Sequence, residues 1–196
     1  MSVEDYLAFE ERSPVKHEYV AGEVYKMSGV TTRHNLITLN IVGPLRHAAR
    51  SRGCKVFATD VKLRAAADRF YYPDVMVACG KAADVELIIE APSVIVEVTS
   101  PSTRATDRRE KLDAYRRIPS LSVYLIVDQR RRQVLAYSRE AGGEWLREEI
   151  RGDGEVPVLG TSITLDEIYE DIELPPLAVG EGEAWEEWEV GEDGDS

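Results

Sequence analysis

Two carboxylates interrupt apolar segments of this 196-residue chain, and their positions are suited to metal chemistry. Glu97 stands inside the run VIVEV at 94–98, and Asp74 follows Pro73 in YYPDVMV at 71–77. An unpaired carboxylate in a buried strand is costly or has a strongly shifted pKa, and a bound cation offsets that cost. Hard oxygen ligands favour Mg²⁺ or Mn²⁺. Alone, Glu97 could be a protonated or ion-paired core residue and Pro73-Asp74 a turn, but together they indicate a divalent-metal site.

Lys111 is the third candidate, on the helix expected directly after the Glu97 strand. It borders the apolar stripe of Leu112, Tyr115 and Ile118, which should pack on the sheet. A lysine at that border can bury its stem and carry its ammonium group to the two carboxylates. The alternative is an ordinary surface lysine paired with an acidic residue four positions earlier.

Two further residues, His34 and Asp60, each have two possible roles. His34 shares a helical stripe with Ile37 and Ile41, so it is either a buried, hydrogen-bonded core histidine or a contact to the metal ligands or to phosphate. Asp60 could join the metal shell from a neighbouring strand, or it could pair with Lys62.

The elements that must position these residues alternate between helical and strand patterns. Helices are predicted at 2–11, at 33–50 with an interruption at Gly43-Pro44, and at 107–117; a hairpin is predicted at 17–28; strands are predicted at 55–64, 70–78, 93–99, 123–127, 133–137 and 145–150. The segment 93–99 is nearly all apolar, as expected of a central strand covered on both faces. The order predicts a mixed α/β sandwich with one core.

The charge is unevenly distributed along the chain. The formal net charge is −12, which disfavours nucleic-acid binding at face value. Eight of the 36 acidic residues, and no Lys or Arg, lie in 181–196, so the remainder carries only −4. The stretch 101–151 is locally basic, with twelve Lys or Arg against eight Asp or Glu. We therefore predict a folded domain at 1–174 and an acidic, disordered tail at 175–196.

The two cysteines indicate a reducing compartment, and the hydropathy of the sequence indicates that no segment spans a membrane. Cys54 and Cys79 show neither zinc-site spacing nor a disulfide framework, and the N-terminus lacks the pattern of a secretory leader. We expect reduced thiols, a cytoplasmic location and no membrane contact, because no apolar run is long enough to cross a bilayer.

Several stretches together resemble one nuclease family. They are KHEY at 16–19 with GE at 22–23, RHN at 33–35, YPDV at 72–75, VEVTSPST at 96–103, DRREK at 107–111 with Tyr115, and YLIVD at 124–128. The chain is similar over about 1–172 to the Uma-two family of endonucleases, a subgroup of the PD-(D/E)XK, or restriction-endonuclease-like, nucleases. This resemblance implies a mixed sheet with flanking helices, an N-terminal helix and hairpin, and C-terminal strand additions.

One position departs from the superfamily pattern. A lysine is expected two residues after Glu97, where this chain has Thr99. The resemblance implies that Lys111 replaces it, that Asp74, Glu97 and the carbonyl of Val98 hold the metal, and that Lys111 assists the attacking water. Glu18 matches a favoured family position and either supplies a further carboxylate or simply belongs to the hairpin.

The resemblance predicts an enzyme, an Mg²⁺- or Mn²⁺-dependent endonuclease that hydrolyses DNA. The alternative is a non-catalytic module on the same fold that binds nucleic acid or protein. The acidic tail and the low pI of about 4.8 favour the alternative, whereas the retention of Asp74, Glu97 and Lys111 together favours the enzyme. A homodimer is compatible with the sequence.

Overall fold

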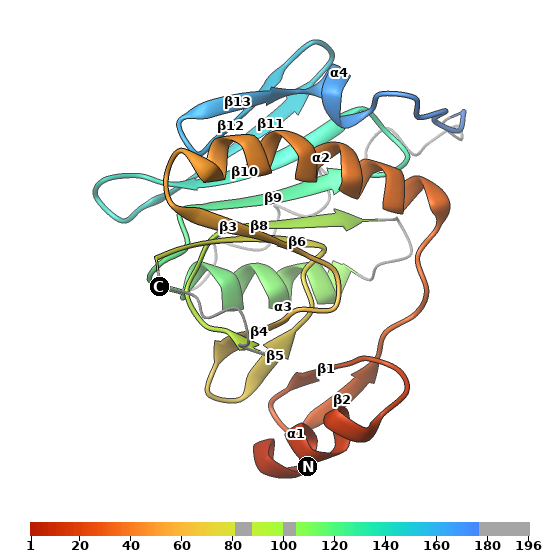
Figure 1. Cartoon of the computed structure of the whole chain (residues 1–196), viewed down its shortest axis with the longest axis vertical. Helices are drawn as coiled ribbons and strands as arrows, with labels where there is room; N and C mark the ends of the chain where they lie inside the picture. The colour runs from red at the N-terminus through yellow and green to blue at the C-terminus, as the bar shows by residue number, and fades with distance from the viewer. Residues whose placement is uncertain (81–87, 100–104, 177–196) are drawn as a thin grey trace, which may run out of the picture.

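The computed structural model describes residues 1–80, 88–99 and 105–176 (Figure 1). The described helices are α1 (Val3–Arg12), α2 (Thr32–Arg50), α3 (Ala105–Arg116) and α4 (Leu165–Ile168). The described strands are β1 (His17–Val20), β2 (Glu23–Lys26), β3 (Cys54–Ala58), β4 (Lys62–Ala66), β5 (Arg69–Tyr71), β6 (Val75–Cys79), β7 (Ile88–Ile89), β8 (Pro92–Thr99), β9 (Val123–Asp128), β10 (Gln133–Arg139), β11 (Trp145–Arg151), β12 (Glu155–Val158) and β13 (Thr161–Thr164). The predicted mixed α/β fold is confirmed.

The main sheet has the strand order β11-β10-β9-β8-β6-β3. Strands β8 and β9 run parallel, with α3 between them in sequence, and the other neighbouring pairs are antiparallel. The apolar segment predicted to be central is indeed β8, which lies inside the sheet between β6 and β9. Its hydrogen bonds are thus satisfied on both edges over most of its length.

Different helices cover the two faces of this sheet. Val96 of β8 belongs to the apolar cluster that contains Leu45 of α2. Ile95 belongs to the opposite cluster, which contains Leu112 of α3. Because side chains alternate along a strand, Glu97 lies on the face covered by α3.

A second sheet, in the order β2-β1-β5-β4-β7, holds the N-terminal part of the chain. Helix α1 packs on it through Tyr6, whose ring stacks on Tyr19 at 4.8 Å and lies 5.5 Å from Phe70. Figure 1 shows α1, β1 and β2 together at one end of the molecule, and β12, β13 and α4 at the other. The hairpin β1–β2 is in this way fixed to the body by β5, which pairs with β1.

Local sequence explains the N-terminal elements. Ser2 caps α1 by accepting a hydrogen bond from the Asp5 N–H, as its position before the helix predicts. The hairpin turns at Ala21 and Gly22, both with positive φ.

The predicted interruption of α2 at Pro44 is wrong, because the helix runs through it. Burial of residues on both sides of Pro44 outweighs the backbone hydrogen bond that proline cannot donate.

Two predicted strands are each divided between the two sheets. The segment 55–64 forms β3 and β4, separated by Thr59 and Asp60 with φ of 51° and 54°. The segment 70–78 forms β5 and β6, separated by the residues around Pro73. Left-handed backbone at two non-glycine residues cannot continue a strand, and proline removes a ladder donor. Because of these two breaks, the same stretch of chain contributes strands to both sheets.

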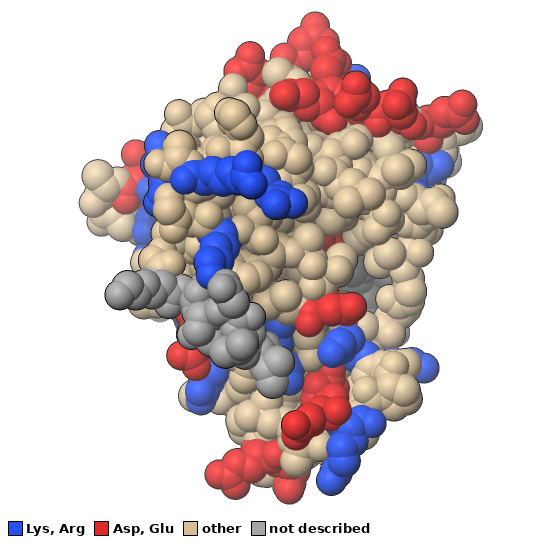
Figure 2. All heavy atoms as spheres, in the orientation of Figure 1, with Lys and Arg blue, Asp and Glu red and all other residues tan. Residues whose placement is uncertain are grey.

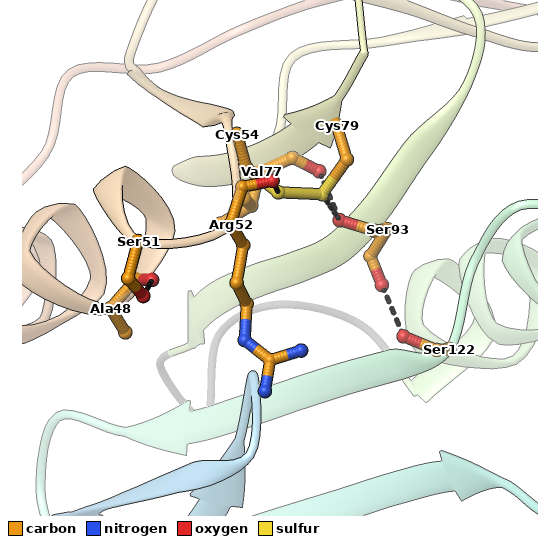
Figure 3. Close-up of a disulfide and its surroundings, with 8 residues drawn as sticks. All are labelled: Ala48, Ser51, Arg52, Cys54, Val77, Cys79, Ser93 and Ser122. Atoms are coloured by element: carbon orange, nitrogen blue, oxygen red, sulfur yellow. Dashed lines mark hydrogen bonds between the residues drawn. A yellow bond between two sulfur atoms is a disulfide. The ribbon is translucent and has the colours of Figure 1, made fainter.

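The prediction of reduced thiols is wrong, because Cys54 and Cys79 form a disulfide. The antiparallel register of β3 and β6 places them directly opposite one another. Figure 3 shows the bond beside Ser93 of β8, whose hydroxyl donates to the Val77 carbonyl at 3.0 Å. Their separation of 25 residues gave no sign of this pairing, which depends on the sheet register.

The C-terminal additions complete one side of the core. The hairpin β12–β13 leads into α4, where Thr164 and Glu167 form a reciprocal capping box. Within the described ranges, no helix is long and apolar enough to cross a membrane. The boundary at 174 stays a prediction, and nearly all of the predicted tail lies outside the described residues.

A matched pair of leucines on α2 tests this packing. Leu45 is fully buried, whereas Leu39 is 56% exposed. We expect Leu45→Ala to lower the free energy of unfolding by about 2–5 kcal/mol, because it leaves a cavity in the core. Leu39→Ala should change it by less than about 0.5 kcal/mol. Urea unfolding followed by circular dichroism measures both, and equal losses would contradict the assignment of the buried face.

Candidate active site

Asp74 lies where the ladder between β6 and β8 breaks. Val75 pairs with Val96, so one further step of this antiparallel register would place Asp74 opposite Glu97. The chain bends at Pro73 instead, and the Asp74 side chain takes the place of the missing strand: its Oδ2 accepts the Val98 N–H at 2.7 Å. The Asp74 carboxylate is therefore fixed at the edge of β8, the strand that carries Glu97.

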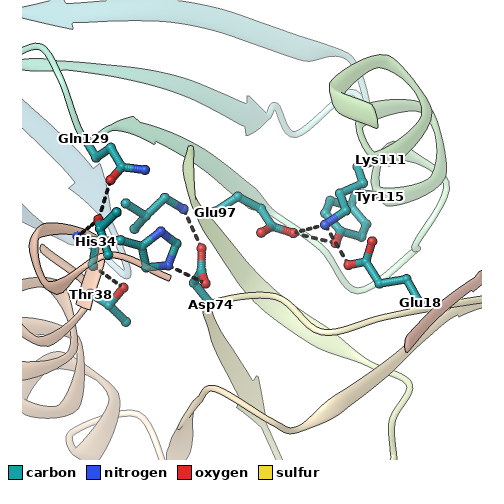
Figure 4. A network of polar contacts seen from close by, with 10 residues as sticks. Glu18, His34, Thr38, Asp74, Glu97, Lys111, Tyr115 and Gln129 are labelled. Carbon is teal, nitrogen blue, oxygen red and sulfur yellow. Dashed lines mark hydrogen bonds and ion pairs between the residues drawn. The ribbon is translucent and has the colours of Figure 1, made fainter. Parts of the chain in front are cut away.

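His34 holds the other oxygen of the same carboxylate. Its Nε2 lies 2.8 Å from Asp74 Oδ1, and its ring is buried at the start of α2 (Figure 4). Thr31 caps the helix by accepting the His34 N–H, and its own hydroxyl donates to Gln129 Oε1 at 2.8 Å. Helix α2 thus orients Asp74 through His34. Both alternatives given for His34 apply, because its ring is buried and hydrogen-bonded and it also contacts a predicted metal ligand.

Glu97 is held from the opposite side by two side chains of α3. Tyr115 donates its hydroxyl to Glu97 Oε1 at 2.8 Å, and Lys111 Nζ lies 3.3 Å from the same oxygen. Lys111 and Tyr115 are four residues apart and so share one helix face. The packing of α3 on the sheet brings the predicted lysine to the predicted carboxylate.

Glu18 reaches the same lysine from the N-terminal hairpin. Its Oε1 lies 2.8 Å from Lys111 Nζ, and both side chains are more than four-fifths buried. Figure 4 shows Lys111 between Glu18 and Glu97. The ring of Tyr71 lies below the ammonium group, with 5.7 Å between Nζ and the ring centroid. Three elements far apart in sequence therefore meet around one cation.

Burial governs the protonation of this cluster. It raises the pKa of Glu97 to about 7, and the negative charges of Asp74 and Glu18 act in the same direction. Lys111 and the Tyr115 hydroxyl oppose the shift without cancelling it. For Lys111, burial would lower the pKa, but Glu97 and Glu18 raise it above its ordinary value. The lysine is thus a permanent cation at neutral pH, but its positive charge does not fully offset the burial of the Glu97 carboxylate.

The donor atoms fit a hydrated divalent ion. No group of three or more His, Cys, Asp or Glu side chains in the described ranges could hold a metal by itself. Two carboxylates with a backbone carbonyl and water are nevertheless a usual arrangement for Mg²⁺. The N–H and C=O of a strand residue point to the same side, so the Val98 carbonyl faces the side on which Asp74 lies. Each Asp74 oxygen keeps a free lone pair beside its hydrogen bond.

Asp60 and Thr99 are the two remaining candidate residues. Asp60 is exposed in the turn after β3, although the preceding Thr59 donates its N–H to the Asp74 carbonyl at 3.1 Å. Thr99 is buried, and its hydroxyl has no hydrogen-bond partner within the described ranges. Its side chain is therefore not part of the hydrogen-bonded network around Glu97 and Asp74 that the structure describes. A role for either residue stays a prediction.

Sequence reasoning missed a second buried carboxylate that supports the site. Glu10 of α1 accepts the His17 N–H at 3.0 Å and the Tyr72 hydroxyl at 2.8 Å, and it contacts the His17 ring at 2.9 Å. Burial would raise the pKa of Glu10, but these hydrogen bonds lower it below its ordinary value. His17 precedes Glu18, and Tyr72 comes two residues before Asp74. The signal was present in sequence as an acidic residue among the apolar positions of α1.

A comparison with family models agrees with this geometry. Residues 3–168 match the model named Uma2, whose description is "Putative restriction endonuclease". The chain belongs to the Uma2 family. Membership supports a nuclease and confirms the resemblance carried by the motifs around Asp74, Glu97 and Lys111.

Relatives and a solved structure extend the comparison. Two proteins of Synechocystis sp., "Uncharacterized protein sll1609" and "Uncharacterized protein slr1290", are 31% and 32% identical to this Uma2 chain. The alignments cover 78% and 86% of this chain, and 89% and 91% of those proteins. A crystal structure of "a putative nuclease belonging to DUF820" from Anabaena variabilis superposes with a TM-score of 0.71 at 16% identity, covering 86% of this chain and 97% of the other. That likeness confirms the restriction-endonuclease-like fold.

The raised pKa of Glu97 predicts a pH-dependent stability. As pH rises from 4.5 to about 7, the unfolded chain loses a proton that folded Glu97 keeps, so this group's contribution to stability is lost across that window. We expect Glu97→Gln, measured in EDTA, to gain melting temperature relative to wild type as pH rises from 4.5 to 7.

The control is Glu148→Gln on β11, because the Glu148 side chain is exposed. The difference between its melting temperature and that of the wild type should stay constant at all pH values. A constant difference between Glu97→Gln and wild type would show that burial does not raise the pKa of Glu97.

Proposed function

We propose that this Uma2 protein is a metal-dependent nuclease that hydrolyses phosphodiester bonds in DNA. One observation carries the proposal: a buried lysine, Lys111, lies between the carboxylates of Glu97 and Glu18, and Asp74 lies at the edge of the strand that carries Glu97. The negative charges of Asp74 and Glu18 both act on Glu97, and a single lysine opposes them, so the cluster keeps a negative charge that favours a further cation. Family membership supplies independent support for nuclease chemistry.

Asp74, Glu97 and the Val98 carbonyl would hold Mg²⁺ or Mn²⁺. Such an ion lowers the pKa of a bound water and neutralises charge on a phosphate. The chain's own residues prepare the ligands for it. His34 and the Val98 N–H fix the two oxygens of Asp74, and Tyr115 fixes one oxygen of Glu97, so neither carboxylate needs to reorganise on binding.

Lys111 has the properties of an electrostatic group rather than a base. Its raised pKa keeps it protonated at neutral pH, so it cannot accept the proton of an attacking water. A fixed cation can instead orient that water or stabilise the charge that develops on the phosphoryl oxygens. Glu18 holds the ammonium from the far side, which leaves Lys111 in place when Glu97 engages another cation.

A direct assay tests the proposal. Single- and double-stranded DNA, and RNA of the same sequence, are incubated with the protein in Mg²⁺ or Mn²⁺ beside the Asp74→Ala variant. The proposal predicts metal-dependent cleavage of DNA by the wild type and none by the variant. The binding-module reading predicts that nucleic acid or protein is bound without cleavage in any metal.

Lys111→Ala separates catalysis from metal binding. Because Lys111 would act on the transition state rather than hold the ion, we expect cleavage to fall by roughly 10²–10³-fold while Mn²⁺ affinity remains. Thr99→Lys in that background should restore part of the activity, since it returns a lysine to the position of the superfamily pattern. Cleavage rates and Mn²⁺ titrations measure both effects.

The matched control is Lys26→Ala, which removes an exposed lysine of β2. It should cleave as the wild type does. Full activity of Lys111→Ala would refute a role for the lysine in the reaction.

A further inference from the structure

An arginine-lined cavity lies beyond the ends of β9 and β11. Its volume is about 380 Å³, and its lining is Arg130, Arg131, Arg132, Gln133, Arg151, Leu174 and Pro175. Four guanidinium groups around one cavity are unusual for a chain with a net charge of −12. We propose that this cavity binds a backbone phosphate of the nucleic-acid strand next to the bond that is cut; the proposal rests on the proposed nuclease function.

The turn that carries three of the arginines has a defined backbone. Asp128, the last residue of β9, accepts the Arg130 N–H on its Oδ1 at 2.7 Å. Gln133, which begins β10, donates its N–H to the Arg131 carbonyl at 2.8 Å. Arg151 joins them because the register of β10 and β11 pairs it with Gln133. Three of the arginines are therefore held in a short turn between two paired strands, and Arg151 is the last residue of β11.

The arginines of the cavity differ in their acidic partners. Arg132 pairs with Asp166, and Arg151 pairs with Glu149. The contacts of the described residues give the Arg131 guanidinium no acidic partner. Arginine stays charged at any physiological pH, and its planar group forms paired hydrogen bonds to phosphate oxygens. Arg131 thus gives the cavity a guanidinium group of the right chemistry for a phosphodiester.

The cavity is connected to the candidate active site through short contacts. Asp128, at the start of the arginine turn, pairs in register with Thr99, two residues after Glu97. The next residue, Gln129, accepts the hydroxyl of Thr31, which caps the helix that carries His34. A strand whose scissile phosphate lies at Asp74 and Glu97 can therefore continue toward the arginines along the same edge of the sheet.

The surrounding acidic residues limit how the strand can lie. Asp166, Glu167, Glu170, Asp171 and Glu173 are exposed on and after α4. Figure 2 shows acidic side chains gathered over α4 and the segment that follows it. A polyanion laid across α4 would be repelled, so the open approach to the cavity is from the side of the candidate active site.

Substitution of Arg131 tests the cavity directly. Binding of a short fluorescein-labelled single-stranded DNA is followed by anisotropy in EDTA, which prevents metal-dependent cleavage, at a series of salt concentrations. We expect Arg131→Gln to weaken binding several-fold and to reduce the slope of log K against log salt by about 0.7, the loss of one phosphate contact. Arg131→Lys should keep most of that slope, because it keeps the charge.

The control Arg46→Gln removes an exposed arginine of α2 that does not line the cavity, and it should bind DNA as the wild type does. Cleavage in Mn²⁺ and melting temperature are measured for every variant, so loss of folding is recognised. If Arg131→Gln binds with unchanged affinity and salt slope while the wild type cleaves DNA, the cavity assignment is refuted and the nuclease function stands. If the wild type neither binds nor cleaves DNA, both are refuted.

Discussion

The structure depends on how the buried charge of Lys111 is balanced. An ammonium group so deeply buried is tolerable only with carboxylates in contact, and here Glu97 and Glu18 supply them from different parts of the chain. Glu97 belongs to the central strand of the main sheet, whereas Glu18 belongs to the N-terminal hairpin. The ion pairs therefore tie the hairpin, β8 and α3 together, and removal of Lys111 would leave two carboxylates in the interior without their counter-charge. A fold that keeps such a cluster carries a cost that hydrophobic residues would avoid, and the proposed catalytic role would account for that cost.

The break in the β6–β8 ladder is the second requirement. A continuous strand would have paired the backbone of residue 74 with β8 and left no ligand position there. Pro73 ends the pairing, and the Asp74 side chain replaces the lost backbone acceptor by taking the Val98 N–H. The same bend, together with the left-handed residues Thr59 and Asp60, divides two long strands between two sheets. The irregularity that builds the site thus also sets the architecture, and Glu10 supports it by holding Tyr72.

Periodic patterns predicted most of the fold. The helical stripe around Ile37 and Ile41 and the apolar run of β8 have local causes, and the structure confirms those elements. The strand break at Thr59 was missed because the segment 55–64 keeps a strand composition through it. Pro73-Asp74 marked a possible turn in 70–78, but only the two-sheet arrangement shows that the strand is divided there. The disulfide was missed because it follows from register between strands, which the spacing of two cysteines does not reveal.

The candidate site could be predicted in part for a similar reason. Asp74 and Glu97 are visible because charge is unexpected in apolar segments, and Lys111 is visible because it borders the buried face of its helix. The pairing of Glu18 with Lys111 and of His34 with Asp74 requires contacts between distant elements, so the sequence left their roles open. The donors to Glu10, which include a backbone N–H, could be found only from the structure.

Titration calorimetry with Mn²⁺ tests the proposed metal site at Asp74 and Glu97 without depending on any cleavage reaction. Wild-type protein is titrated at neutral pH beside Asp74→Asn and Glu97→Gln, with melting curves to confirm that each variant is folded. A metal site at Asp74 and Glu97 predicts one Mn²⁺ bound per wild-type chain and a large loss of affinity in both folded variants. Equal Mn²⁺ binding by all three proteins, or none by the wild type, would contradict it.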